Sequence, residues 1–424
     1  MRYFKVTLLF GSAIALLVIA LDQLRLFHPL DLSLTTFLDK IPPPKSSHPF
    51  QYPLLFLCSL GIAWTTIDIQ RRTHQAFVVI AVLLQIFTAV WVFDLYNSFF
   101  SPFPLALTVI ATFFTTLFFT HTPTGSRKHR LTELLGNRVS QKTFLSLLNS
   151  NLPLHLTGQP ANISIVICEV VNLQELEATL SPENFVSITH SFQKNASDFL
   201  VLSGGYLDAS DAQSVRVIFG SPLPDSTHPI TASLAAWALA KHLDEVNRQC
   251  LSIWKRSFDF RIAIHSGKSV VSAYSTPLLS SLSISGEALE FTRHLVTANR
   301  TYGSRILLSN PTFDLAESSI ETRSLDRFQR SPQSSPEEIY ELLGPKNTLS
   351  PDALERLHLF RKAINATRDA RWDDAASLFA SAKNPHAPDL PTEFYLRRIA
   401  QLRQGIPALP PPSLSTPSAE SFAQ

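Results

Sequence analysis

Residues Gly204–Pro222 read GGYLDASDAQSVRVIFGSP and predict a β-hairpin. A Gly pair precedes a short strand, and a polar turn separates this strand from Val215, Val217 and Phe219, which alternate before Gly-Ser-Pro. Alternation with a period of two is typical of a half-buried strand, and clustered Gly, Asp and Ser residues are typical of turns. The turn also contains Gln213. We therefore expect two antiparallel strands joined by a short polar turn.

Strand and helix patterns alternate on both sides of this hairpin. Upstream, NISIVICEV is a short β-branched strand, and Ser181-Pro182 begins a helix with a serine N-cap and a proline in the first turn. Downstream come an Ala-rich helix from Ile230 to Leu243, a pair of strands FDFRIAIHSG and SVVSAYS, a helix GEALEFTRHLVTANR, a core strand SRILLSN and an edge strand EEIYELLG. This order predicts an α/β domain with a ferredoxin-like, mixed and mainly antiparallel sheet.

Four apolar segments occupy the N-terminal third. They are Phe4–Leu21, Tyr52–Ile67, Ala76–Phe93 and Phe103–Phe119. Each is close to the about 17–25 residues that span a bilayer, the second being the shortest. A signal peptide is the alternative for the first segment, but Asp22-Gln23-Leu24-Arg25 follows it instead of a small-residue cleavage site. The sequence predicts a transmembrane region with four helices.

Basic residues set the predicted orientation of these helices. They flank the start of the first segment, separate the second from the third and follow the fourth, at Arg2, Lys5, Arg71, Arg72, Arg127, Lys128 and Arg130. All lie on one side if the N-terminus is cytoplasmic, and only Lys40 and Lys45 oppose them. We expect a multi-pass membrane protein with its N-terminus and its C-terminal domain in the cytoplasm.

Charge and cysteine usage exclude some functions. A formal net charge of +2 gives no argument for nucleic acid as a partner. Cys58, Cys168 and Cys250 have no metal or redox spacing, so we expect reduced thiols. His265, in RIAIHSG, is expected in the core rather than at a metal.

Helical patterns precede and follow the predicted α/β domain. In the linker, RLTELLGNRVSQKTFLSLLN has apolar residues at helical spacing, so it either pairs with its copy in a homodimer or packs on the domain. In the tail, ARWDDAASLFASA and the helix after it resemble one tetratricopeptide-like repeat, which needs a packing partner because about three repeats make an independent solenoid. The last residues are rich in Pro and Ser, which predicts disorder.

The α/β segment resembles the catalytic domain of class III adenylate and guanylate cyclases of the membrane-anchored bacterial type. The matching stretches are collinear with the family pattern: GGYLD…VRVIFGSP, THPITASLAAWALA, RIAIHSGKSVV, ISGEALEFTRHL, YGSRILLS and LDRF…PEEIYELL. The lead-in LLGNRVSQKTFLSLL is similar as well. The resemblance implies a dimer with composite sites between the subunits, and two Mg²⁺ or Mn²⁺ ions if the domain is active.

The resemblance places the two metal-binding carboxylates of the family at Glu169 and Gln213. Glu169 is longer by one methylene than the family's Asp, a handicap because Mg²⁺ geometry is strict. Gln213 carries no charge, and Ala212 stands where the family has glycine. Asp208 and Asp211 are nearby carboxylates that would have to replace the missing one, although Asp211 also fits a turn residue.

The other catalytic positions of the family depart from its pattern too. The purine-reading positions fall on Ala209 and Ser283, and the ribose-orienting and transition-state positions fall on Glu290 and His294. Glu290 would repel a polyphosphate, and His294 helps only when protonated. At spacing i, i+4 these two side chains could instead pair with each other.

These observations predict five segments and one leading function. The segments are a four-helix transmembrane region (1–124), a helical linker (125–160), a cyclase homology domain (161–345), a helical tetratricopeptide-like tail (346–405) and a Pro/Ser-rich end (406–424). We expect a catalytically degenerate cyclase homolog of the bacterial inner membrane that dimerises and acts in signal transduction, without a cofactor and with a protein partner at the tail. The alternatives are an active adenylate cyclase with an atypical metal site and a membrane-tethered interaction scaffold.

Overall fold

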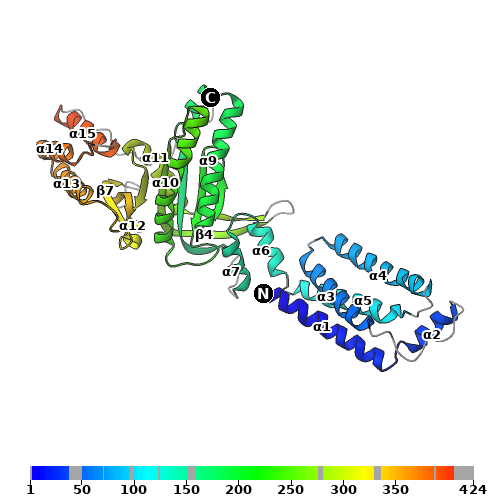
Figure 1. Cartoon of the computed structure of the whole chain (residues 1–424). Coiled ribbons are helices and arrows are strands. Elements are labelled where there is room, and N and C mark those ends of the chain that lie inside the picture. Colours follow the sequence, from blue (N-terminus) through cyan, green and yellow to red (C-terminus); the bar gives the residue numbers. More distant parts are fainter. Residues whose placement is uncertain are drawn as a thin grey trace, which may run out of the picture. The chain divides into compact units, whose positions relative to one another are not determined.

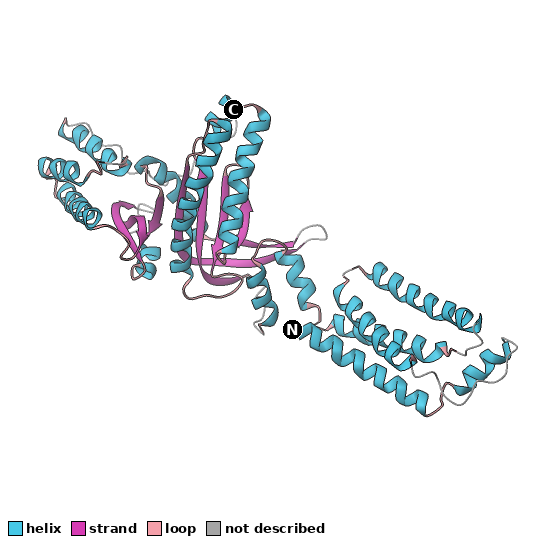
Figure 2. Ribbon diagram, in the orientation of Figure 1, coloured by secondary structure: helices cyan, strands magenta, loops and turns pink. Residues whose placement is uncertain are grey.

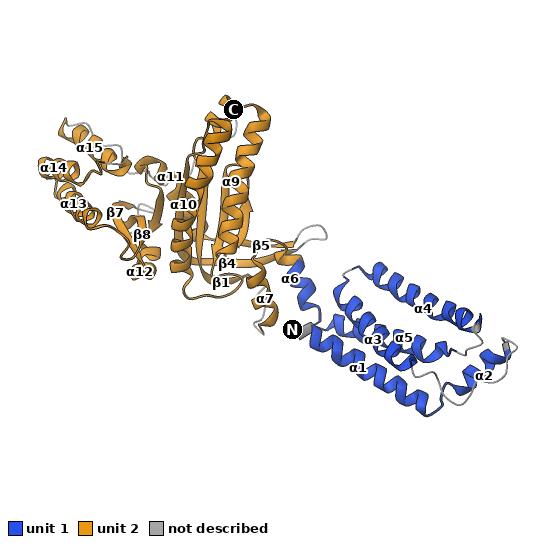
Figure 3. Cartoon of the chain, viewed as in Figure 1, with its two compact units in different colours: residues 1–132 blue, residues 133–424 orange. Residues whose placement is uncertain are grey.

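The described part of the chain forms two compact units. The computed structural model describes residues 2–37, 50–69, 71–95, 100–122, 125–150, 158–275, 280–328, 336–385 and 388–404. Residues 1–132 form the first unit and residues 133–424 the second (Figure 3). Lys40, Lys45 and the predicted disordered end lie outside the described residues.

The first unit is helical. Its helices are α1 (Arg2–Gln23), α2 (His28–Phe37), α3 (Gln51–Asp68), α4 (Arg72–Leu95) and α5 (Pro102–His121). Three stretches in the described residues are long and apolar enough to cross a membrane: Phe4–Gln23, Arg72–Phe93 and Pro102–His121. The second predicted span forms α3 but is not among these three. The prediction of a membrane region is therefore supported by three candidate spans.

Helix α3 packs against both α1 and α5, and several of its polar residues find partners inside the unit. The Ser59 hydroxyl is fully buried, donates a hydrogen bond of 2.7 Å to the carbonyl of Gly11 in α1 and lies 3.1 Å from the hydroxyl of Thr112 in α5. Small side chains at such contacts let helices approach closely without leaving polar groups unsatisfied. Leucine and phenylalanine side chains are exposed on α1, α4 and α5, as expected of helices that face lipid, including Leu9, Leu17, Phe77, Leu84 and Phe118.

The second unit contains one mixed sheet. Its strands are β1 (Gln159–Val170), β2 (Tyr206–Ser210), β3 (Ser214–Phe219), β4 (Phe260–Ser275), β5 (Ser280–Ser285), β6 (Ile306–Ser309), β7 (Ile320–Phe328) and β8 (Glu337–Pro345). The order is β2-β3-β1-β4-β6-β8-β7, and β5 pairs with β4. Figure 2 shows the strands in magenta. Only β4 and β6 run parallel among the described pairs. The predicted α/β fold with a mainly antiparallel sheet is confirmed.

Helices cover both faces of this sheet (Figure 1). The helices of the domain and the segment before it are α6 (Arg127–Leu135), α7 (Gln141–Asn149), α8 (Leu173–Thr179), α9 (Pro182–Leu202), α10 (His228–Trp254), α11 (Glu287–Tyr302) and α12 (Asn310–Ala316). Val166 and Cys168 of β1 join the core beneath α9 and α10, whereas α11 packs on β4, β1 and β6 from the other face. Ile165 and Ile167 are buried as well, so β1 is covered on both sides. Because side chains alternate along a strand, Glu169 points to the face that carries α11.

Two strand predictions need correction. FDFRIAIHSG and SVVSAYS do not pair with each other, because they form the single long strand β4, which pairs with β1 along residues 159–170. Gly267 is not a turn residue, and a Cβ there would lie 2.9 Å from the ring of His265. EEIYELLG is not an edge strand, since β8 lies between β6 and β7. The edge is β7, IETRSLDRF, whose alternating charges are typical of edge strands.

The predicted hairpin is present as β2 and β3, and the Gly pair before it has a steric reason. Gly204 has φ +104°, a conformation that side chains disfavour. A Cβ on Gly205 would lie 2.2 Å from Cγ1 of Val217, so β2 can reach β3 only without a side chain there. These two glycines allow the end of α9 to turn directly into the sheet.

The C-terminal helices pack on the sheet edge through buried charges. They are α13 (Pro351–Arg368), α14 (Trp372–Ala382) and α15 (Leu390–Arg403). Arg323 of β7 is only 13% exposed and pairs with Glu341 of β8 and, at 2.8 Å, with Asp389 at the start of α15. The hydroxyl of Tyr395 donates a 2.6 Å hydrogen bond to the carbonyl of Leu325. The tail therefore has its packing partner within the chain, and its likeness to a tetratricopeptide repeat stays a prediction.

A buried chain of hydroxyl groups joins two histidines across the sheet. Ser164 of β1 lies 2.7 Å from Nδ1 of His228 and 2.6 Å from the hydroxyl of Ser266 in β4. The chain continues through Thr312 and Ser309 to Nδ1 of His265, which is a core residue as expected. Burial lowers the pKa of His228, an effect that Asp225 partly offsets.

The lowered pKa of His228 predicts that the second unit loses stability in acid. The folded state disfavours the protonated ring of His228. The contribution of this residue to the free energy of unfolding is therefore complete above its ordinary pKa of 6.5 and is lost as the pH falls below that value. We expect the thermal midpoint of the full chain to fall between neutral and mildly acidic pH, and to fall less steeply in His228→Asn. Intrinsic fluorescence, with Trp237 and Trp254 on α10 as probes, measures the midpoint. His358→Asn is the control, because this exposed ring should leave the slope unchanged.

Candidate functional site

The candidate site lies where β1 ends. Glu169 is the last but one residue of β1 and pairs in register with Ser214 of β3 and Arg261 of β4. Its side chain is 15% exposed. A carboxylate with this little access to water needs hydrogen bonds or a positive charge from the protein.

Two side chains provide these contacts. Nε2 of Gln213 donates a 2.9 Å hydrogen bond to Oε1 of Glu169, and the guanidinium of Arg300 forms an ion pair with the same oxygen. The backbone reinforces the first contact, because the amide of Val170 donates a 2.8 Å hydrogen bond to the carbonyl of Gln213. The fold therefore brings together the two positions that the sequence analysis assigned to metal binding, and adds Arg300 to them.

This arrangement does not fit a divalent metal ion. Gln213 directs its amide nitrogen, a donor, toward the carboxylate, whereas a metal requires oxygen acceptors. Arg300 places a fixed positive charge at the carboxylate and would repel a cation. Among the described residues, no group of three or more His, Cys, Asp or Glu side chains is placed to hold a metal.

The two nearby aspartates are engaged elsewhere. The carboxylate of Asp211 accepts hydrogen bonds of 2.8 and 2.7 Å from the amides of Gln213 and Ser214, which is the hydrogen bonding of an Asx turn. Asp208 lies at a β-bulge and forms an ion pair with Arg216, and only 9% of its side chain is exposed. As substitute metal ligands, both aspartates would have to break these contacts.

The predicted purine-reading positions lie on strands that meet. Ala209 is on β2, beside Arg216 of β3, and Ser283 is an exposed residue of β5. The two strands are joined where the amide of Leu282 donates a 3.1 Å hydrogen bond to the hydroxyl of Tyr206. Ala209 offers only a methyl group, which cannot recognise the polar edge of a base.

Helix α11 carries the remaining predicted positions. Glu290 does not pair with His294, because its carboxylate forms a 2.8 Å ion pair with Arg293. Burial lowers the pKa of His294; Glu290 opposes this shift and Arg293 adds to it. His294 is therefore uncharged at neutral pH, and an uncharged ring cannot stabilise a developing negative charge.

Arg300 was missed by the sequence analysis. Arg300 lies ten positions after Glu290, which corresponds to about 15 Å along a helix. Within one chain, Arg300 and Glu290 therefore do not belong to the same site. The signal was weak: a basic residue in the last turn of a helix is ordinary, because it also interacts favourably with the helix dipole. Only the packing of α11 against β1 shows which carboxylate it contacts.

The C-terminal tail holds the turn of α11 that carries Arg300. The hydroxyl of Tyr302 donates a 3.0 Å hydrogen bond to Asp326, and its ring contacts Phe394 of α15 edge to face. Gly303 ends the helix with φ +71°, and a Cβ there would lie 2.7 Å from Leu390. The position of Arg300 therefore depends on the docking of α15.

Comparisons with known proteins identify similar domains. No protein-family model matches the chain. Adenylate cyclase 1 of Rhizobium meliloti (strain 1021) is 21% identical over 193 residues, which are 45% of this chain and 29% of that protein. Similar solved structures include the guanylyl cyclase Cya2 (19% identity, 46% of this chain, 97% of that chain, TM-score 0.42) and the adenylyl cyclase CyaB from P. aeruginosa (20%, 46%, 100%, TM-score 0.42).

The predicted resemblance to class III nucleotide cyclases is confirmed by the match to adenylate cyclase 1. The chain matches less than a third of the length of the curated relative. The loss of catalytic groups, and the role of each site residue, stay predictions.

Removing the guanidinium of Arg300 is predicted to destabilise the second unit. Arg300→Met leaves the largely buried carboxylate of Glu169 with the amide of Gln213 alone, which we expect to cost about 1–2 kcal/mol because Arg300 itself is partly exposed. Thermal unfolding of the full chain measures the loss. Arg293→Met is the matched control on the same helix, since its exposed pair with Glu290 should contribute about 0.5 kcal/mol or less. Equal losses in both variants would contradict a special role for Arg300.

Proposed function

We propose that this chain is a membrane-anchored cyclase homolog that has lost catalysis and acts as a dimerising regulatory module in intracellular signalling. The observation that carries the proposal is the state of Glu169, whose carboxylate is neutralised by Arg300 and hydrogen-bonded by the amide nitrogen of Gln213. The position that would bind the catalytic metals is thus occupied by groups of the protein itself.

The chemistry of cyclisation explains why this matters. Attack of a ribose hydroxyl on the α-phosphorus of a nucleoside triphosphate concentrates negative charge, which two divalent ions would otherwise stabilise. A single guanidinium supplies one positive charge and has no open coordination position for a nucleophile or a phosphate. Removal of one preorganised charge-stabilising contact typically costs about 3–4 kcal/mol of transition-state stabilisation.

The substrate-facing positions support the same conclusion. Ala209 cannot hydrogen-bond a base, Glu290 is negative and His294 is uncharged at neutral pH. In a composite dimer site, one subunit would contribute the Glu169 half and the other the α11 half. Both halves are altered in this chain, so pairing with an intact partner leaves each composite site damaged.

The proposed dimer forms through the cyclase-like domain. The linker contributes less than its sequence suggests, because most of its apolar residues are already buried within one chain, including Leu135, Val139 and Leu147. This burial favours the alternative in which α6 and α7 pack on their own domain. Arg138, between them, donates a 3.0 Å hydrogen bond to the carbonyl of Asp208.

Loss of catalysis is tested by product formation. The full chain in detergent, incubated with ATP or GTP and Mn²⁺, is expected to form no more cyclic nucleotide than Glu169→Ala, as measured by mass spectrometry. Thermal unfolding confirms that both proteins are folded.

Metal-dependent product above the Glu169→Ala background would show instead an active cyclase with an atypical site, using Mg²⁺ or Mn²⁺. Asp208 and Asp211 would then be the next residues to change. If there is no product and deletion of residues 351–424 removes a bound protein, the chain is better described as a membrane-tethered scaffold.

We further propose four membrane spans, with both ends of the chain in the cytoplasm of a bacterium. Helix α3 is 18 residues long and lies against α1 and α5, two of the candidate spans. Buried polar residues on this helix, such as Ser59 and Thr66, are hydrogen-bonded within the unit. An inner helix does not need a fully apolar surface, so α3 is suited to cross the bilayer inside the bundle.

Membrane topology distinguishes four spans from three. Fusions of a reporter that is active only in the cytoplasm, at the N-terminus and after residue 150, are expected to be active at both positions. An even number of spans places these positions on the same side. Activity at only one of them would mean that α3 does not cross, and would contradict the four-span proposal.

A further inference from the structure

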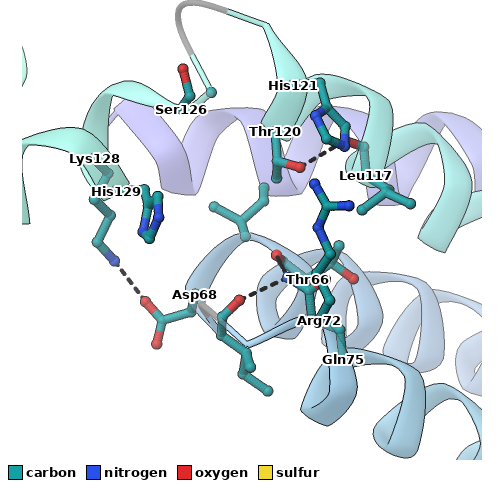
Figure 4. Close-up of a pocket in the computed structure, with 13 residues that line it drawn as sticks. Thr66, Asp68, Arg72, Gln75, Leu117, Thr120, His121, Ser126, Lys128 and His129 are labelled. Atoms are coloured by element: carbon teal, nitrogen blue, oxygen red, sulfur yellow. Dashed lines mark hydrogen bonds and ion pairs between the residues drawn. The ribbon is translucent and has the colours of Figure 1, made fainter. Parts of the chain in front are cut away.

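A pocket lies in the first unit where four helix ends meet. Its volume is about 250 Å³, and it is lined by residues from the end of α3, the start of α4, the end of α5 and the start of α6 (Figure 4). Arg72 extends from α4 toward the end of α5, near Thr120 and His121 (Figure 4). On the other side, Lys128 reaches Asp68 at 2.6 Å.

Side-chain charges decide the electrostatics of this pocket. Two helix N-termini and two helix C-termini converge there, so their dipoles oppose one another. Arg72 and Lys128 carry two positive charges, and Asp68 is the one carboxylate among the lining residues. His121 and His129 add ring N–H groups, which are hydrogen-bond donors. The lining therefore has a net positive charge and several hydrogen-bond donors.

The floor of the pocket is fixed by a buried glutamine. Gln75 is 8% exposed, and its Nε2 donates hydrogen bonds of 2.9 and 2.7 Å to the carbonyls of Thr66 and Ile69 at the end of α3. These contacts satisfy carbonyls that would otherwise face the pocket with negative charge. The ion pair of Lys128 with Asp68 then ties α6 to the same helix end. The pocket is thus bounded by a hydrogen-bonded framework.

The position of the pocket selects the kind of ligand. Arg72 begins one candidate span and His121 ends another, so the pocket lies at the level where the apolar part of the bilayer gives way to its headgroups. Positively charged pockets between transmembrane helices at this level bind anionic lipid headgroups. The volume is below the about 300–1,000 Å³ of pockets that enclose a whole small ligand, so a headgroup fits better than a nucleotide.

We propose that this pocket binds the phosphate of an anionic phospholipid headgroup. Arg72 contributes the main positive charge, since it forms no ion pair within the described residues, and the hydroxyl of Thr120 lies beside it. Asp68 opposes binding, because it competes with the phosphate for Lys128. The lipid would then replace part of the link between α3 and α6, the helix that leads to the second unit. This proposal does not depend on the loss of catalysis.

The test compares lipid binding by full-length variants in detergent. Native mass spectrometry with added phosphatidylglycerol is expected to show specific binding, with phosphatidylcholine clearly weaker. Arg72→Gln should weaken phosphatidylglycerol binding roughly fivefold, the effect of one basic residue near an anionic headgroup. Asp68→Asn should strengthen it by a similar factor. Opposite effects of the two substitutions on lipid affinity are expected only if the residues act on a bound ligand. If both residues had only a structural role, either substitution would weaken binding.

Arg71→Gln is the matched control, because this neighbouring exposed arginine does not line the pocket. The affinity of Arg71→Gln for phosphatidylglycerol should equal that of the unaltered chain. Equal weakening by Arg71→Gln and Arg72→Gln would show general surface attraction and overturn the proposal. Equal binding of both lipids would overturn it too. Displacement of the lipid by equimolar inorganic phosphate would instead identify a site for free phosphate.

Discussion

The central constraint of the second unit is a carboxylate at the end of a strand that is buried on both faces. Strand β1 has helices above and below it, so the carboxylate of Glu169, which is only 15% exposed, relies on partners within the protein. Arg300 meets this requirement from α11, and Gln213 adds a hydrogen bond from the hairpin. Three elements far apart in the sequence are thereby fixed at one point: the central strand, the β2-β3 hairpin and the end of α11.

The same helix end links this point to the tail. Two residues beyond Arg300, Tyr302 contacts Asp326 and Phe394, and Asp326 in turn forms a 3.0 Å ion pair with Arg398 of α15. Burial of such charges is favourable only when their partners are in place, so the tail and the end of α11 should stabilise each other. A protein bound to the tail would consequently act on the surroundings of Glu169 through a single helical turn. This gives the proposed regulatory role a physical route within the chain.

Local features of the fold could be predicted from the sequence, and long-range pairings could not. Ser181 was expected to cap α9, and its hydroxyl accepts a hydrogen bond from the amide of Asn184. The hairpin followed from its glycines and its alternation. Arg300 was not found, because it lies 131 positions from Glu169 and only the packing of α11 shows which acid it contacts. The long strand β4 was divided wrongly at Gly267, because a glycine resembles a turn unless the pairing with β1 is known.

The partners of the acidic residues support the proposed loss of catalysis. An active site that must hold metal ions keeps carboxylates close together and unpaired, and such strain lowers stability. Here Glu169 has Arg300, Asp208 has Arg216, Glu290 has Arg293 and Asp211 accepts the amides of its own turn. Each acid that could have taken part in metal or substrate chemistry is thus satisfied within the chain. Such internal pairing favours a stable folded surface over a reactive one, as the proposed regulatory module would require.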